Sequence, residues 1–540
     1  MSLPARQDQA PAGPLDRGIF YLLIMGALFV GALVLRLIFI HWSRFAGDES
    51  MFYGEASAIV NLGWRPVMCA NVSGGAARLP GGTFSYLMSG PLWIFRSPLA
   101  VMIWVALLNL GAYALWTDAV RRNAGRLASL IFAALLLFNP WSFLYSDRIW
   151  NPNLMVLLSG LLIWATVRVV ERPSSWHLLW IPLVVLAGPQ FHMSGVLLAV
   201  LALVLWLACR PKPMNKKALA LGFGLGLALY IPYLLSEIST GFHNSQALLA
   251  LPSDSTFQWS RFYSPLLNQI LMAGGEVGYL VNKGYWFPHD AWRFYTELGG
   301  WGRVVTVLGD GLLGWLLALV SMLAVVTVLL TWTGWFVALV RRGRNAWGWL
   351  VADPLRLGFL VAVLLPTLFM TAGRKSYHPH YAMVFYPFGF LPLAWAGQAL
   401  IRRRGLLRGL LPLGLGLFVL CLVWIGASVG LYAHGERRFS YPEHRAVMEI
   451  IEAEAGPKPF ALELRHRASR HSTSSFHELA RHDTKRPFRE DHRAALRFTW
   501  FDLEDGLRLL DLPKPRVAGR PVLKHWVLDG SVLVMSRRSR

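Results

Sequence analysis

The amino-acid sequence predicts an all-α polytopic transmembrane bundle of about 11 helices, followed by a small extramembrane α/β domain at the C-terminal end. Hydrophobic residues make up 55% of the 540 residues and charged residues only 15%, whereas about a quarter of a soluble domain is charged. The apolar residues also fall in long runs, and a helix needs about 20 of them to cross hydrocarbon. These runs begin near Ile19, Leu99, Leu127, Leu154, His177, Val196, Ala218, Leu312, Leu355, Tyr381 and Leu406.

Basic clusters in the short connections between apolar runs contribute much of the formal net charge of +22. They follow every second run, which is the pattern that the positive-inside rule gives to cytoplasmic loops. The charge therefore indicates topology, and no nucleic-acid partner is expected. The clusters are Arg121, Arg122 and Arg126; Arg168 and Arg172; Arg210, Lys212, Lys216 and Lys217; Arg341, Arg342 and Arg344; and Arg402, Arg403, Arg404 and Arg408.

This alternation divides the chain into three parts. Residues 1–18 are expected to form a cytoplasmic tail, residues 19–432 the transmembrane module, and residues 433–540 an outward C-terminal domain. Two further outward segments, about 41–96 and about 236–302, interrupt the module. Segments of this length inside a compact protein usually carry function.

Two outward segments have a recognisable pattern. Asp48 to Leu62 predicts an amphipathic helix along the membrane interface, with an apolar side formed by Met51, Phe52, Ala56, Ile59 and Val60. The C-terminal segment lacks a spanning run, and its strand-like stretch His525–Met535 indicates a small α/β domain.

The sequence Gly47-Asp48-Glu49 is the strongest local signal of chemistry. Two adjacent carboxylates follow the first crossing and open the interfacial helix. A structural interpretation is a helix N-cap with a second acid in the first turn, because the helix dipole favours both. A functional interpretation is a general base, which requires a carboxylate close to the reacting group.

Other polar groups recur on the same outward side of later crossings. Ionisable groups near a membrane are costly and usually face a cavity or pathway, so we expect this set to converge. Carboxylates and cations at one level can supply a base and a clamp for an anionic leaving group. The set faces outward, where nucleotide donors are normally absent, and the sequence has no Gly-rich phosphate loop. A phosphate-linked lipid that arrives through the bilayer is therefore the expected donor. The set comprises Asp147, Arg148, His192, Arg374, Lys375, His378, His380 and Tyr381.

The chain resembles the polytopic GT-C glycosyltransferases, specifically the bacterial branch similar to protein O-mannosyltransferases and aminoarabinose transferases. The resemblance covers roughly residues 19–431 and depends on Gly47-Asp48-Glu49 with Tyr53 and Glu55-Ala56, on Asn139-Pro140-Trp141 leading to Asp147-Arg148, and on His380-Tyr381 leading to Tyr386-Pro387. It implies a bacterial inner-membrane enzyme with a GT-C-like fold and a periplasmic site. Such an enzyme takes a polyprenyl-phosphate sugar from the bilayer and inverts the anomeric centre during transfer.

The resemblance also suggests roles for individual residues. Asp48 resembles the acid that activates or orients the acceptor hydroxyl, Glu49 supports it, and Asp147 resembles a second acid of the outward loops. Four basic residues are expected to grip the donor phosphate, whose charge grows in the transition state. These are Arg78, Arg148, Arg374 and Lys375; His192, His378, His380 and Tyr381 complete the expected substrate-binding set.

One departure from the family concerns a metal. Some relatives carry a Glu-Lys-Pro element after the interfacial helix, where this chain has Ala77-Arg78-Leu79-Pro80. The glutamate is absent, and the outward histidines lack a helix-spaced motif such as His-Glu-x-x-His. No cofactor is predicted and no residues are assigned to a metal, although the resemblance leaves a divalent metal open.

The acceptor and the exact class of function stay open at the level of sequence. A lipid, a glycan or a protein hydroxyl would each fit an outward site. A flippase or transporter of a lipid-linked saccharide is an alternative, but it predicts polar residues at mid-bilayer, broken helices and repeats. A polysaccharide polymerase or ligase shares the donor chemistry, and the long second outward segment agrees with it.

Overall fold

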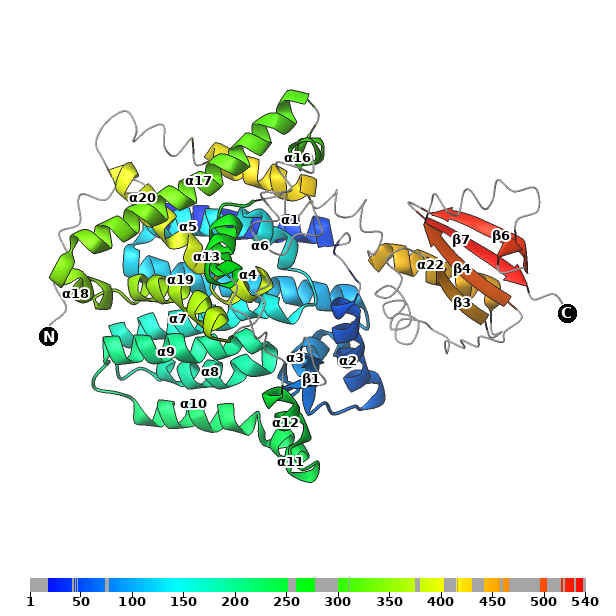
Figure 1. Cartoon of the computed structure of the whole chain (residues 1–540), viewed down its shortest axis with the longest axis horizontal. Coiled ribbons are helices and arrows are strands. Elements are labelled where there is room, and N and C mark those ends of the chain that lie inside the picture. The colour runs from blue at the N-terminus through cyan, green and yellow to red at the C-terminus, as the bar shows by residue number, and fades with distance from the viewer. Residues whose placement is uncertain are drawn as a thin grey trace.

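The structure is a computed structural model of the whole chain (Figure 1). The parts described below are residues 18–40, 43, 45, 47–72, 77–250, 259–276, 300–309, 311–373, 379–402, 414, 416–429, 441–456, 460–465, 496–502, 516–517, 520–528 and 531–537. Helices dominate the chain up to residue 429, and a small unit with strands follows. The predicted all-α bundle with a C-terminal α/β unit is therefore confirmed.

The longer helices of the bundle are α1 (Gly18–Phe39), α4 (Pro98–Ala124), α5 (Arg126–Phe138), α7 (Met155–Glu171), α8 (Trp180–Phe191), α9 (Val196–Cys209), α10 (Lys216–Ala228), α13 (Trp259–Ala273), α17 (Gly311–Arg341), α19 (Pro354–Gly373) and α20 (Leu391–Arg402). Shorter helices connect them: α3 (Thr83–Ser89), α6 (Pro140–Tyr145), α11 (Ile231–Ser239), α12 (His243–Leu249), α16 (Gly300–Leu308) and α18 (Ala346–Val351). The 3-10 helices are η3 (Gly90–Trp93), η4 (Asn151–Leu154), η5 (Trp176–Leu179), η6 (Met193–Gly195), η7 (Gly343–Asn345), η8 (Pro379–Val384) and η9 (Tyr386–Phe390).

Several of the predicted crossings are shorter or less regular than an unbroken span. Among the described residues, four helices are long and apolar enough to cross a membrane, or up to six spans if each of two bent pairs counts as one. The run near Leu127 ends at Phe138, just before Pro140, and the run near Tyr381 begins as the 3-10 helices η8 and η9. Proline lacks a backbone N–H and clashes with the preceding turn, so it interrupts helices that average hydropathy would draw as continuous.

The predicted interfacial helix is α2, and its bounds are Asp48–Leu62 as expected. It is more buried than an interfacial helix with one wet face, since Phe52, Ala56 and Ile59 are buried together with Glu49 and Tyr53. A two-stranded antiparallel hairpin follows it, made of β1 (Met68–Asn71) and β2 (Arg78–Pro80). The hairpin and α3 pack beside α2 in Figure 1.

The C-terminal unit combines α22 (Tyr441–Ala455) with a five-stranded sheet in the order β3-β4-β7-β6-β5. Its strands are β3 (Phe460–Arg465), β4 (Leu496–Asp502), β5 (Arg516–Val517), β6 (Arg520–Leu528) and β7 (Ser531–Arg537). Only β3 and β4 pair in parallel. The stretch predicted as one strand, His525–Met535, belongs to two antiparallel strands, β6 and β7, because residues on both sides of Asp529-Gly530 have strand character.

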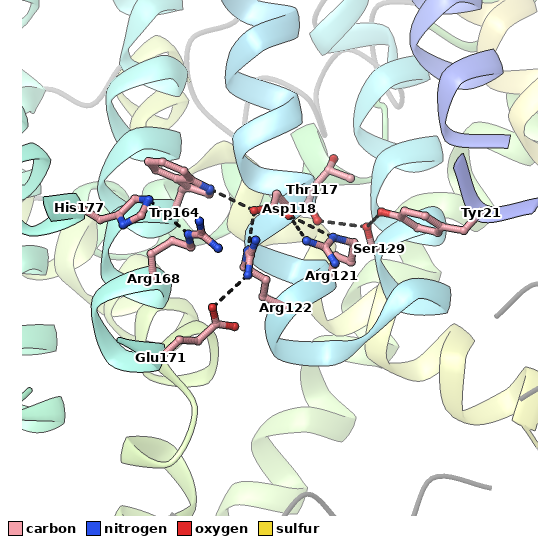
Figure 2. Close-up of polar contacts among 10 residues, drawn as sticks. All are labelled: Tyr21, Thr117, Asp118, Arg121, Arg122, Ser129, Trp164, Arg168, Glu171 and His177. Carbon is pink, nitrogen blue, oxygen red and sulfur yellow. Dashed lines mark hydrogen bonds and ion pairs between the residues drawn. The ribbon is translucent and has the colours of Figure 1, made fainter. Parts of the chain in front are cut away.

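One end of the bundle, here called the arginine end, is held together by Asp118 of α4 (Figure 2). Its carboxylate accepts hydrogen bonds from Arg121 Nε (3.0 Å), Arg122 Nε (2.7 Å) and, across to α7, Trp164 Nε1 (3.1 Å). Arg122 Nη1 also bonds Glu171 Oε2 of α7 at 3.1 Å. Pairing with carboxylates and helix C-termini stabilises these cations, so the cluster joins α4 to α7.

The arginine end lies far from Asp48 along the bundle. Helix α7 has 17 residues, begins directly after η4 and ends at Glu171. At 1.5 Å per residue it therefore separates its two ends by about 25 Å, close to the thickness of hydrocarbon. The chain that leads from Trp150 through η4 to Met155 thus lies at the opposite end of the bundle from the cluster in Figure 2.

The turn between α8 and α9 supplies a test of packing. Gly188 of α8 and Gly195 of η6 lie backbone to backbone, so a Cβ at Gly195 would overlap Gly188. We expect Gly195→Ala to lower the free energy of unfolding by about 1–3 kcal/mol, the usual cost of forcing atoms into a packed region. The matched control is Gly224→Ala in α10, where a Cβ meets nothing within 4 Å. Thermal unfolding of both variants in detergent checks this, and equal midpoints would contradict it.

Candidate functional site

The two acids at the start of α2 point in different directions. Consecutive residues of an α-helix project about 100° apart, so one carboxylate can face solvent while the next is buried. Asp48 is exposed, whereas Glu49 is only 1% exposed. The N-cap position belongs to Gly47, whose φ of 58° is a conformation that glycine adopts without strain. Asp48 is therefore not the N-cap of α2, and both acids lie in the first turn of the helix.

Glu49 forms a buried ion pair with Arg148. Arg148 Nε donates to Glu49 Oε1 at 2.8 Å, and Arg148 Nη2 bonds the same oxygen. The guanidinium also lies 4.9 Å from the ring centroid of Tyr145 and 4.8 Å from that of Trp150. Arg148 therefore forms its ion pair with an acid 99 positions away, although Asp147 directly precedes Arg148 in the sequence. The pair joins α2 to the loop before η4.

Asp48 is held at the edge of this pair by Trp150, whose indole N–H donates to Asp48 Oδ2 at 2.9 Å. Trp150 also belongs to a ring cluster, here defined as Trp150, His192, His380 and Tyr381. His380 lies 4.9 Å from Trp150 and 4.5 Å from Tyr381, and His192 lies 5.3 Å from Tyr381, all between ring centroids. An exposed carboxylate thus borders rings that come from three distant parts of the chain.

His192 lies at the turn between α8 and η6. Its Nδ1 is 2.8 Å from the Ser194 hydroxyl and accepts the Ser194 backbone N–H at 3.2 Å. Burial lowers the pKa of His192 to about 4, so the imidazole is neutral at pH 7. A neutral ring suits a hydrogen-bonding role toward a sugar better than a role as a phosphate counter-ion.

Asp147 is buried and is bonded by Ser43. Its Oδ1 accepts a hydrogen bond from the Ser43 hydroxyl at 3.2 Å. Burial raises the pKa of Asp147 to about 7, against the opposing effect of the Arg36 guanidinium. The residue expected to be a second acid of the site is thus a buried carboxyl, one position before Arg148 in the chain.

Arg78 was expected to grip a phosphate, but in this structure it holds the hairpin against α2. Its Nη2 lies 3.1 Å from Glu55 Oε1, and its Nε donates to the Cys69 carbonyl at 2.9 Å. Glu55 Oε2 also accepts from the Ser85 hydroxyl at 2.6 Å. Burial raises the pKa of Glu55, and the partner hydroxyl and guanidinium oppose that shift. The sequence drew attention to Glu55 only within a motif and gave no sign of this pairing.

The structure therefore brings together six of the expected residues: Asp48, Glu49, Arg148, His192, His380 and Tyr381. Arg374, Lys375 and His378 lie outside the described residues, next to His380 in the sequence. Within the described ranges no three His, Cys, Asp or Glu side chains gather as a metal site. Sequence reasoning missed Trp150, which holds Asp48, and Arg36. Arg36 had a signal, because it is the one charged residue inside the first apolar run.

Comparison with known proteins yields distant structural matches. No family model matches the sequence, and no curated protein matches it either. ArnT from Cupriavidus metallidurans bound to undecaprenyl phosphate is similar over 94% of this chain and 97% of its own, with 15% identity and a TM-score of 0.45. The apo state of that protein gives the same coverage, 16% identity and a TM-score of 0.46.

The apo oligosaccharyltransferase of Archaeoglobus fulgidus is similar over 89% of this chain and 65% of its own, with 11% identity and a TM-score of 0.46. These are membrane glycosyltransferases of the GT-C type, the kind of protein to which the sequence resemblance pointed. Identities this low concern the fold alone, and with TM-scores below 0.5 the likeness carries no weight for the chemistry of this chain.

The Glu49–Arg148 pair can be tested by removing one partner at a time. Glu49→Gln leaves a buried guanidinium uncompensated, and Arg148→Met leaves a buried carboxylate, so each should lower the free energy of unfolding by about 3–5 kcal/mol. The double variant Glu49→Gln/Arg148→Met should lose less than the sum. The control Glu171→Gln, at a half-exposed pair of the arginine end, should cost at most about 1 kcal/mol. Strictly additive losses in detergent unfolding would show that the two residues do not interact.

Proposed function

We propose that this protein is a membrane glycosyltransferase that moves a sugar from a polyprenyl-phosphate donor to an acceptor on the periplasmic side of a bacterial inner membrane. The observation that carries the proposal is the exposed Asp48 carboxylate, held at the edge of a buried Glu49–Arg148 ion pair beside rings from distant segments. A positioned carboxylate is a general base, and rings offer apolar faces to sugar C–H groups.

In the proposed reaction Asp48 accepts the proton of the acceptor hydroxyl as that oxygen attacks the anomeric carbon. The bond between the anomeric carbon and the phosphate oxygen breaks on the opposite face, so the anomeric configuration inverts. The polyprenyl phosphate leaves with the bonding electron pair, and Asp48 later releases its proton to water. Trp150 keeps Asp48 in place by its indole N–H, while Glu49 fixes the first turn of α2 through Arg148.

Negative charge grows on the phosphate as it leaves, so a nearby guanidinium stabilises the transition state more than the ground state. Arg148 is a candidate, because it bonds Glu49 and lies over the ring of Trp150, which bonds Asp48. Arg374 and Lys375 adjoin His380 in sequence. A lipid-borne donor needs no nucleotide pocket, because its isoprenoid chain stays in hydrocarbon while its phosphate reaches the end of the bundle. The acceptor can be a lipid, a glycan or a protein hydroxyl.

The charges at the two ends of the bundle support the proposed orientation. Arg121, Arg122, Arg168, Arg341 and Arg402 all stand in the last turns of helices, the first three of them in the cluster of Figure 2. The opposite end of α7 adjoins Asp48, Glu49 and Asp147. Since cytoplasmic loops carry the excess of arginine and lysine, the arginine end is assigned to the cytoplasm and Asp48 to the periplasm.

Replacing Asp48 tests the proposed base. We expect Asp48→Asn to lower turnover by at least about 100-fold, the usual contribution of a general base, because the amide cannot accept the proton. Polyprenyl phosphate or its sugar ester should still co-purify with the variant and be detected by mass spectrometry of extracted lipids. The control Glu171→Gln should keep wild-type turnover.

A variant Asp48→Asn that transfers sugar at the wild-type rate would rule out Asp48 as the base. If neither protein transfers sugar from a polyprenyl phosphate, while both move a lipid-linked saccharide across vesicles, the transporter alternative is favoured instead.

Cysteine labelling tests the orientation. In a chain with Cys69, Cys209 and Cys421 replaced by alanine, single cysteines would be placed at Leu62 and at Trp176, which are exposed at opposite ends of the bundle. We expect a membrane-impermeant maleimide to label Leu62→Cys in intact spheroplasts, because it lies on the side of Asp48. Trp176→Cys should react only after the membrane is opened. The reverse pattern would assign the site to the cytoplasm.

A further inference from the structure

Arg36 is a charged side chain buried inside the first apolar helix. It is 1% exposed, and its guanidinium donates to four acceptors of the protein. Nε donates to Ser146 Oγ at 2.6 Å, and Nη1 donates to the Ala32 carbonyl at 3.0 Å. Nη2 donates to the carbonyls of Leu137 (3.2 Å) and Ser142 (3.4 Å). A cation persists at such a position only when its donors are satisfied, and it usually marks function.

Two of the carbonyls that Arg36 binds, those of Leu137 and Ser142, belong to a break in the bundle between α5 and α6. Pro140 has no backbone N–H, and the N–H of Trp141 donates to the Asn139 side chain at 2.9 Å instead of to the helix. The Leu137 carbonyl, which would accept the Trp141 N–H in a continuous helix, is thereby left for Arg36. Because hydrocarbon supplies no water to such groups, Arg36 completes the hydrogen bonding of the break.

The same guanidinium reaches the turn that carries Arg148. Ser146 accepts from Arg36 through its hydroxyl and from Asn109 Nδ2 of α4 through its carbonyl, at 3.0 Å. Asp147, the next residue, bonds Ser43, and Arg148 follows with its bond to Glu49. The side chain that fixes the start of α2 therefore lies only two positions after the residue that Arg36 binds.

We propose that Arg36 is a positioning residue of the transferase site: from α1 it holds the α5–α6 break and the Ser146 turn, and through Arg148 and Glu49 it sets the place of Asp48. The catalytic part of this inference rests on the function proposed above, and the structural part does not. Arginine is required because its planar fork directs donors at acceptors on three sides, whereas a lysine ammonium offers three donors from one point.

Three variants of the full-length protein test the inference: Arg36→Met, Arg36→Lys and the control Tyr21→Phe. Tyr21 also lies in α1 and also bonds α5, since its hydroxyl is 3.1 Å from Ser129 Oγ, but this contact is at the arginine end (Figure 2). The control thus removes a polar contact between the same two helices at the other end of the bundle.

We expect Arg36→Met to lower kcat by about 100-fold, the cost of displacing a catalytic group by about 1 Å, with the KM for the polyprenyl-phosphate sugar unchanged. Amide hydrogen exchange in residues 139–153 should become faster in the same variant. Arg36→Lys should recover part of both effects, and Tyr21→Phe should change neither. A loss confined to stability would leave kcat intact in the folded fraction.

Wild-type kcat and exchange in Arg36→Met would overturn the proposal, as would equal effects in Arg36→Met and Tyr21→Phe. A lysine variant no better than the methionine variant would also overturn it. If the wild-type protein transfers no sugar, the proposed function fails on its own. The exchange rates of residues 139–153 then still decide whether Arg36 holds the turn.

Discussion

A helix that breaks inside an apolar bundle must find new partners for its backbone, because lipid offers none. In this protein the break at Asn139-Pro140 is the constraint on which the arrangement of the site depends. The Asn139 side chain caps the new helix and also binds the carbonyls of Met272 and Ala273, while Arg36 takes the carbonyls of Leu137 and Ser142. A chain that turns here can bring Arg148 back toward α2, whereas a continuous helix would carry it past α2.

Arg148, brought back by this turn of the chain, binds the start of α2. Asp48 and Glu49 are consecutive residues of a helix, so their side chains project about 100° apart. Asp48 is therefore exposed to solvent, while Glu49 is buried against the Arg148 guanidinium. The buried Glu49–Arg148 pair fixes the first turn of α2. The exposed Asp48 therefore lies beside Trp150, whose ring packs against His380. At the arginine end of the bundle, Asp118 joins α4 to α7 through its bonds with Arg121, Arg122 and Trp164. Both ion-paired clusters thus join segments of the bundle, and the exposed Asp48 is the carboxylate that we propose as the base.

Much of this architecture could be predicted from sequence. The apolar runs predicted the helical bundle, and the amphipathic pattern after Gly47 predicted the bounds of α2. The alternation of basic loops predicted that Asp48, His192 and His380 lie on one side. The pairings could not be predicted, since a salt bridge depends on how helices turn and not on sequence distance. Arg148 pairs with the distant Glu49, whereas Asp147, its neighbour in the sequence, is bonded by Ser43. The ion pair between Arg78 and Glu55 could not be predicted for the same reason. The helix break at Pro140 falls inside a stretch whose average hydropathy predicts one continuous helix.

The Glu49–Arg148 pair also has an evolutionary consequence. The two residues are 99 positions apart, and neither is tolerable in a water-poor environment without the other. Selection therefore acts on them as one unit, so related chains should retain both or replace both. Asp48 has no buried charged partner, since its carboxylate is exposed and bonds the neutral indole of Trp150, so it is not tied to a second charge in the same way.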